Sequence, residues 1–86
     1  MNLHDKRNVQ RVFRAMAADW NCPVGMVKVI LQRTIDRNWE KAMLVGEKKA
    51  LWDKYFPKGK PTPDQYILWL GRAHEKGEDV PYLLNE

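Results

Sequence analysis

Apolar residues recur every three or four positions in successive segments of this chain, the spacing that lines up side chains along one face of an α-helix. Residues 5–20 form the first such segment. Its predicted inward stripe consists of Val9, Val12, Phe13, Met16, Ala17 and Trp20. No segment alternates apolar and polar residues between turn signals as a β-strand does, so the pattern predicts helices alone.

A second helix is predicted from Pro23 to Met43, after the interruption Asn21-Cys22-Pro23. Proline suits the first turn of a helix, which places Asn21 or Cys22 at or near the N-cap. The predicted inward side holds Val24, Val27, Leu31, Thr34, Ile35 and Asn38, with Ile30 at one flank. The predicted outward side holds Gly25, Val29, Gln32, Arg33 and Asp36.

Two shorter helices follow. Gly46 marks a break, and Glu47–Phe56 is predicted as a helix that buries Leu51, Trp52, Tyr55 and Phe56. After the proline- and glycine-containing turn at 57–61, Thr62 is the predicted cap of the last helix, Pro63 its first residue, and Gln65 the partner in a capping box. The predicted apolar spacing continues through Tyr66, Ile67, Leu70, Ala73 and His74 to Gly77 as the C-cap.

The pattern as a whole predicts one all-α domain over residues 1–86, built from four helices. The tail 78–86 contains the apolar run Val80-Pro81-Tyr82-Leu83-Leu84. We expect this run to pack on the core, with a docking segment as the alternative.

Composition narrows the class of partner. Residues 1–41 carry a net charge of +4, whereas residues 42–86 are neutral. A basic half favours an anionic partner, although a soluble surface that is simply basic has the same composition. The single cysteine, Cys22, fits a reducing compartment, and the absence of a signal-peptide pattern adds to the expectation of a cytoplasmic protein. No apolar run has the length of a membrane span, so no membrane partner is expected.

Residues suited to catalysis are few. His4, His74 and Cys22 have no spacing typical of a metal site, and the chain contains neither a glycine-rich phosphate loop nor a nucleophile motif. We therefore expect a protein that is not an enzyme and that carries no cofactor. His74 is predicted to be a packed side chain and Cys22 a small structural one.

The junction of the first two helices matches a helix-turn-helix, which would span about residues 13–39. Ala17 provides the small residue where the helices cross, and Asn21 tolerates the left-handed backbone of the turn. Val27 and Ile30 provide apolar anchors on the second helix. The fold class predicted is thus a small four-helix domain with a helix-turn-helix core.

In such a motif the outward N-terminal half of the second helix would read double-stranded DNA. The predicted DNA-binding residues are Gly25, Met26, Lys28, Val29, Gln32 and Arg33. Gln32 would bond adenine, Met26 and Val29 would touch thymine methyls, and Lys28 or Arg33 would reach guanine or phosphate. Phosphate contacts are predicted for Arg7, Arg11 and Arg14 on the first helix. The alternative is that Met26 and Val29 pack under another helix or face a protein partner.

Two segments carry a family resemblance. Trp20–Val27, continuing through Ile30, Ile35 and Trp39, resembles the helix-turn-helix in the C-terminal DNA-binding domain of the sporulation initiation regulator, stage-zero sporulation protein A. Lys60–Ile67 resembles the K-P-T segment that opens that family's last helix. The similarity covers roughly residues 16–76 and is most specific at the Asn-to-Trp spacing and the K-P-T cap.

The resemblance implies an all-α fold that binds the major groove and regulates transcription in sporulation, often as a head-to-tail pair, which would make the chain a homodimer on DNA. It places the DNA contacts on the same six residues of the second helix. The family's receiver domain has no counterpart here. Met26 and Val29 stand where the family has arginines, and Gly25 where it has serine.

The sequence therefore supports two hypotheses. The first is a DNA-binding transcriptional regulator. The second is a protein-interaction module on the same scaffold that no longer binds DNA, with Met26, Val29 and the Tyr82-Leu83-Leu84 tail as its contact surface.

Overall fold

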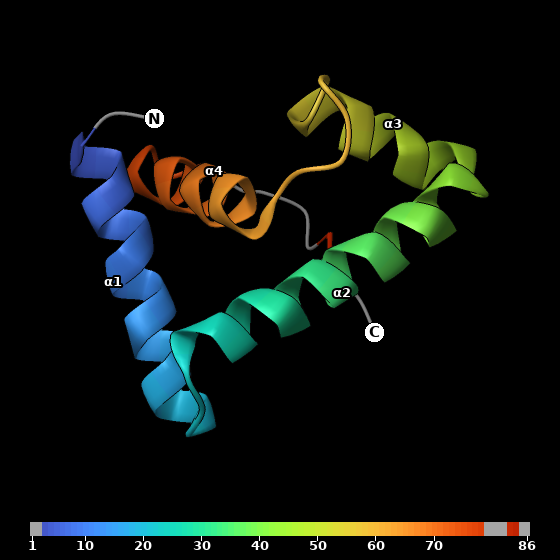
Figure 1. The fold of residues 1–86 in the computed structure, drawn as a ribbon. Helices are drawn as coiled ribbons and strands as arrows, with labels where there is room; N and C mark the ends of the chain where they lie inside the picture. Colours follow the sequence, from blue (N-terminus) through green and yellow to red (C-terminus); the bar gives the residue numbers. More distant parts are fainter. Residues whose placement is uncertain (1–2, 79–82, 85–86) are drawn as a thin grey trace.

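Every regular element of the structure, a computed structural model that describes residues 3–78, 83 and 84, is an α-helix. The described residues form α1 (Leu3–Trp20), α2 (Val24–Met43), α3 (Gly46–Tyr55) and α4 (Pro63–Glu75). In Figure 1, α1 and α2 diverge from their junction as the two sides of a V, α4 lies between them, and α3 lies at the far end of α2. The predicted all-α class with four helices is confirmed over these residues.

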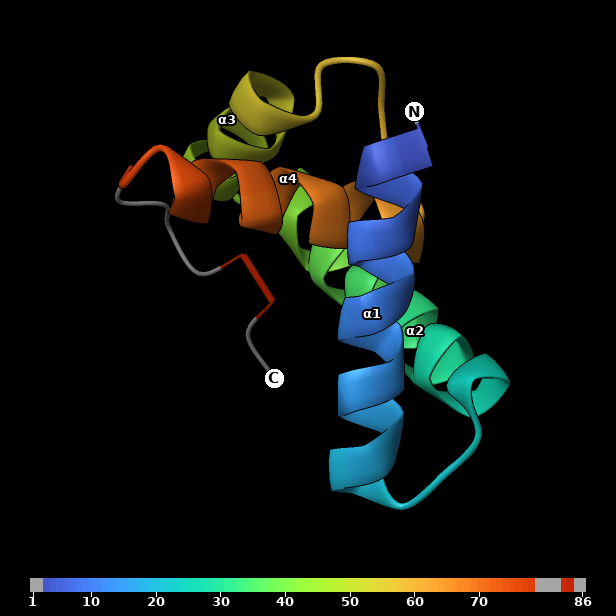
Figure 2. The same ribbon diagram turned by 90° about the vertical axis from the view of Figure 1, so that its left-hand side faces the viewer.

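Helix α2 contacts each of the other three helices, and α1 also contacts α4. Figure 2 views the side on which α1 crosses α2. Because all four helices and the chain end contribute side chains, the core is one continuous apolar cluster. The buried members of that cluster are Val9, Phe13, Ala17, Val27, Leu31, Ile35, Ala42, Trp52, Tyr66, Ile67, Leu83 and Leu84.

Aromatic rings connect α2, α3 and α4. The ring centroids of Trp39 and Trp52 are 5.5 Å apart in an edge-to-face arrangement, and those of Trp52 and Phe56 are 5.8 Å apart. Phe56 continues to Trp69 of α4 at 5.2 Å, and Trp69 lies 5.0 Å from Tyr55. Contacts of this kind add about 0.5–1.5 kcal/mol per pair beyond simple burial, so they fix α3 against the rest of the domain.

One polar side chain is buried within α2. Asn38 is 7% exposed, and its Nδ2 donates a hydrogen bond to the carbonyl oxygen of Thr34 at 2.8 Å. A buried amide without a partner would cost about 1–3 kcal/mol, which this bond avoids. The predicted inward position of Asn38 is therefore confirmed.

Both ends of α4 follow the predicted signals. Thr62 Oγ1 accepts from the Gln65 amide at 3.2 Å, and the Thr62 amide donates to Gln65 Oε1 at 2.9 Å, which completes the capping box with Pro63 in the first turn. Gly77 has φ 67° just beyond the last turn, where the amide of Glu78 donates to the carbonyl of Ala73 at 3.0 Å. A left-handed glycine closed by such a bond is a common helix ending.

Helix boundaries differ from the predictions at two places. Pro23 occupies the N-cap of α2 in an extended conformation, with φ −65° and ψ 153°, rather than the first helical position predicted for it, and Cys22 directly precedes this cap. An extended N-cap suits proline, whose φ is fixed and whose missing N–H is not needed there. Gly46 begins α3 rather than marking the break, because the chain leaves α2 at Leu44 and Val45.

Several side chains predicted to be buried are exposed instead. Val12 and Trp20 lie at the edge and the end of α1, outside the narrower Val9–Phe13–Ala17 row that α2 and α4 cover, and Trp20 is 45% exposed. His74 is also exposed, although its neighbour Ala73 is buried, so its side chain lies on the outward side of the last turn of α4. Its predicted packed role is wrong.

The end of the chain returns to the core. Leu83 and Leu84 are both buried in the apolar cluster, which confirms packing for this part of the tail and removes it as a free contact surface. The predicted contributions of Val80, Pro81 and Tyr82 lie outside the described residues.

Candidate nucleic-acid interface

The corner between α1 and α2 is built around Asn21. Its φ of 52° makes it the one non-glycine residue with a positive φ in the part of the chain that the structure describes. The Asn21 amide donates to the carbonyl of Ala18 at 3.3 Å, and the Cys22 amide donates to that of Ala17 at 3.0 Å. These bonds satisfy the last carbonyls of α1 and reverse the chain within three residues, so the predicted left-handed turn at Asn21 is confirmed.

Ala17 of α1 and Val27 of α2 both belong to the buried apolar cluster. Val27 has no exposed surface, and Ala17 is 8% exposed, which agrees with their predicted roles as anchor and small crossing residue. The second predicted anchor, Ile30, is wrong because its side chain is 40% exposed. Leu31 takes the inward position instead, since the buried row of α2 advances by four residues from Val27 to Leu31 and Ile35.

The N-terminus of α2 is open to the surroundings. No side chain caps it, and its first turn contains no acidic residue. A Cβ placed on Gly25 would meet no atom within 4 Å, so the backbone there can be approached closely. Free amide groups and the positive end of the helix dipole favour an anion such as a phosphate at this position.

The six predicted DNA-binding residues divide between two sides of α2. Gly25, Met26, Val29 and Arg33 are exposed on the outer edge. Lys28 and Gln32 are half-buried on the side facing α4. Helical spacing accounts for the division, because Lys28 and Gln32 are four residues apart, as are Val29 and Arg33, while Gly25 lies where the two sides meet.

Lys28 lies against neighbouring helices rather than at the outer edge. Its ammonium is 5.0 Å from the centroid of the Phe13 ring and 3.7 Å from Oδ1 of Asp64 at the start of α4. Both charged side chains of this pair remain more than a third exposed, so the pair itself is weak.

Gln32 is held by a carboxylate. Its Nε2 donates to Oδ1 of Asp36 at 2.9 Å, and the same carboxylate oxygen is 2.8 Å from Nζ of Lys60. The Lys60 ammonium, hydrogen-bonded to the carboxylate, and then the Gln32 amide lower the pKa of Asp36 from its ordinary value of 3.8. The amide that was predicted to bond adenine is therefore engaged within the protein.

The predicted phosphate contacts lie together on α1. Arg7, Arg11 and Arg14 are all exposed, and with Lys6 they line a shallow hollow along the helix that contains no carboxylate. Such a cluster produces a local positive potential without the cancelling charges found elsewhere on the chain.

The outer edge of α2 contains two further exposed residues, Ile30 and Arg37, that are not among the six predicted DNA-binding residues. Ile30 had been assigned to the inward side, and Arg37 had no assigned role. They lie four residues after Met26 and Arg33, respectively, on the same face. That spacing is the sequence signal that identifies them.

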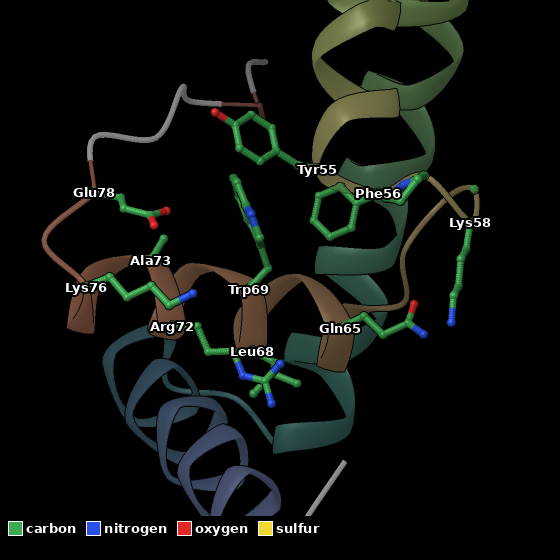
Figure 3. A pocket seen from close by; sticks show the side chains of 12 residues that line it. Tyr55, Phe56, Lys58, Gln65, Leu68, Trp69, Arg72, Ala73, Lys76 and Glu78 are labelled. Atoms are coloured by element: carbon green, nitrogen blue, oxygen red, sulfur yellow. The ribbon is translucent and has the colours of Figure 1, made fainter.

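A second surface feature is a groove of about 470 Å³ between the end of α3, the turn at 57–59 and α4 (Figure 3). Rings of Tyr55, Phe56 and Trp69 gather on one side of it, and Lys58 points away from them. Of the residues that the structure describes, those lining the groove include no histidine or cysteine and one carboxylate, that of Glu78. The groove therefore has the volume of a small-molecule site.

Among the residues described, no three His, Cys, Asp or Glu side chains are grouped to hold a metal ion. Within the same residues, no helix combines the length and the apolar character that crossing a bilayer requires. No protein-family model, curated protein or solved structure matches the chain.

Proposed function

We propose that this protein binds double-stranded DNA through a helix-turn-helix formed by α1 and α2, and that it acts as a transcriptional regulator. The observation that carries the proposal is the exposed outer edge of α2 directly after the Asn21 turn. Val27 is buried in the core, and Gly25, Met26 and Val29 are therefore exposed on the first two turns of α2. A helix held in this way can enter the major groove.

The distribution of charge supports a DNA partner. The hollow lined by Arg7, Arg11 and Arg14 supplies cations for phosphates, and Arg33 adds another on the outer edge of α2. The open N-terminus of α2 supplies backbone amides for a further phosphate. Backbone contacts of this kind provide most of the affinity and fix the orientation of the protein on the duplex. A role in sporulation and assembly as a head-to-tail pair rest on the family resemblance.

One observation favours a second function. Met26 is 50% exposed and Val29 is 46% exposed on the outer edge of α2, and Trp20 at the end of α1 is 45% exposed. Exposed apolar side chains that cluster in this way are typical of a protein-binding surface. In this alternative the scaffold binds a protein partner and the affinity does not depend strongly on salt.

Titration of a fluorescent duplex at several salt concentrations distinguishes the two functions. We expect micromolar binding of duplex DNA at about 50 mM salt, with an affinity that falls linearly on a double-logarithmic plot of salt. Undetectable binding at that salt concentration and micromolar protein would contradict the proposal.

A matched pair of variants locates the phosphate contacts. Replacing Arg11 and Arg14 by alanine should reduce the magnitude of the salt slope by about 2, because about 0.9 is lost per phosphate contact. Replacing Lys48 and Lys49 on α3 by alanine changes the net charge equally and should leave the slope close to that of the parent protein. Equal effects of both pairs would show that only net charge matters.

A further inference from the structure

The side chains on the outer edge of α2 indicate which bases the protein would contact, an inference that rests on the proposed function. Met26, Val29 and Ile30 are exposed there, and they lie on one face with Arg33 and Arg37. The exposed side chains on the N-terminal part of this edge, those of Met26, Val29 and Ile30, are therefore all apolar. The first cation on this edge, Arg33, follows one turn after Val29.

The polar side chains of the same turns are directed elsewhere. The Gln32 amide donates to Asp36, whose carboxylate is also bound by Lys60. Lys28 lies over the Phe13 ring and beside Asp64. Neither group lies on the outer edge, so hydrogen bonding to base edges is left to Arg33 and the more distant Arg37.

In the major groove, an apolar side chain discriminates between bases mainly by contact with the thymine methyl group. A guanidinium can donate two hydrogen bonds to O6 and N7 of guanine. We infer that this protein reads duplex DNA through a run of thymine methyl groups contacted by Met26, Val29 and Ile30, next to one guanine contacted by Arg33. Most of the base contacts are thus apolar.

Replacement of thymine by uracil tests the inference directly, because it removes the 5-methyl group and leaves every hydrogen-bonding group in place. A preferred duplex is first selected from a random library at about 50 mM salt. We expect a site rich in A·T pairs with one conserved guanine. The deoxyuridine version of that duplex should bind about fourfold more weakly for each methyl group contacted, which corresponds to about 0.8 kcal/mol per carbon buried.

Variants assign the contacts to residues. Val29→Ser should reduce the thymine-to-uracil affinity ratio, and Arg33→Ala should abolish the preference for guanine while leaving that ratio unchanged. Leu44→Ser changes an exposed apolar residue at the far end of α2 and should alter neither quantity. Lys28→Ala should leave the preferred sequence unchanged, because Lys28 lies beside Asp64 and not on the outer edge. Circular dichroism checks that each variant is folded.

Different failures overturn different statements. Equal binding of the thymine and uracil duplexes, with affinity intact, overturns methyl recognition and leaves DNA binding standing. If Lys28→Ala abolishes the guanine preference and Arg33→Ala does not, the assignment of the guanine contact to Arg33 on the outer edge is overturned. Absence of binding to any duplex overturns both the inference and the proposed function, and favours a protein partner for the same face.

Discussion

Asn21 shows how much of the fold can depend on one backbone conformation. Its positive φ lets the chain turn directly from α1 into α2, and the amides of Asn21 and Cys22 close the end of α1. Most residues pay about 1–2 kcal/mol to adopt this conformation, whereas asparagine and especially glycine adopt it more readily. Residue type at this position therefore affects both stability and the direction in which α2 leaves the corner.

Substitution of Asn21 tests this account. We expect Asn21→Ala to lower the free energy of unfolding by about 1 kcal/mol, because alanine has a Cβ that opposes a positive φ and lacks the local hydrogen bonding of asparagine. Asn21→Gly should leave the stability equal or raise it. Urea denaturation followed by circular dichroism measures both. Equal losses in the two variants would show that the asparagine side chain, and not the backbone conformation, stabilises the corner.

At the scale of helices, α4 is tied to α1 and α2 by charged side chains at several points. The guanidinium of Arg72 donates to Oδ2 of Asp5 of α1 at 2.6 Å. The ammonium of Lys28 of α2 lies 3.7 Å from Oδ1 of Asp64. Lys60, just before α4, binds Asp36 of α2. Apart from Asp5, the side chains of these pairs are more than a third exposed, so each pair contributes little to stability, but together they favour one position of α4 between the arms of the V (Figure 1).

The Lys60–Asp36 pair gives the domain a pH dependence. Because the pKa of Asp36 is lower in the folded protein than its ordinary value of 3.8, its contribution is fully present above about pH 4. That contribution is lost as the pH falls through the folded-state pKa. We expect Asp36→Asn to lose less stability than the parent protein between pH 5 and about pH 2.

Carboxyl NMR titration measures the same effect at the residue itself. Lys60→Met should raise the pKa of Asp36 toward its ordinary value, because it removes the group that lowers that pKa most. Lys58→Met removes a nearby lysine for which no contact with Asp36 is present and serves as the control. A pKa of Asp36 that is the same in all three proteins would contradict the structural pairing.

At the scale of the molecule, the last residues complete a core that the helices alone leave partly open. Leu83 and Leu84 are buried although they follow α4 and belong to no helix. A domain of this size has little core to spare, because small domains bury a smaller fraction of their surface than large ones. The C-terminal leucines are therefore expected to be structural.

Two leucine-to-alanine substitutions compare this buried end with an exposed site. Leu84→Ala should reduce the free energy of unfolding by about 2–5 kcal/mol, as for other buried leucines. Leu44→Ala makes the same chemical change where the side chain is 87% exposed and should cost no more than about 0.5 kcal/mol. Thermal and urea unfolding measure both. Similar values would show that the tail does not pack on the core in solution.

The sequence alone determines the helices of this protein, because helix starts and ends depend on interactions between residues that are close in sequence. The capping box at Thr62 and Gln65, the left-handed positions at Asn21 and Gly77, and the helical spacing of Val9, Phe13 and Ala17 act over a few residues. Their effects can be predicted without knowledge of the rest of the chain. The all-α class follows from these signals together.

Tertiary packing decided which of the apolar and polar side chains remain available for a partner. Periodicity identifies an apolar stripe but not its covered width, so Ile30 and Trp20 were assigned to the inward side although neighbouring helices leave them exposed. In the same way, the position of Lys28 beside Asp64 depends on how α4 packs against α2, whereas Gln32 and Asp36 lie four residues apart on one helix, and that spacing is visible in the sequence. Asp64 begins a helix distant in sequence, and such long-range pairing is set by how helices pack, which no local pattern encodes.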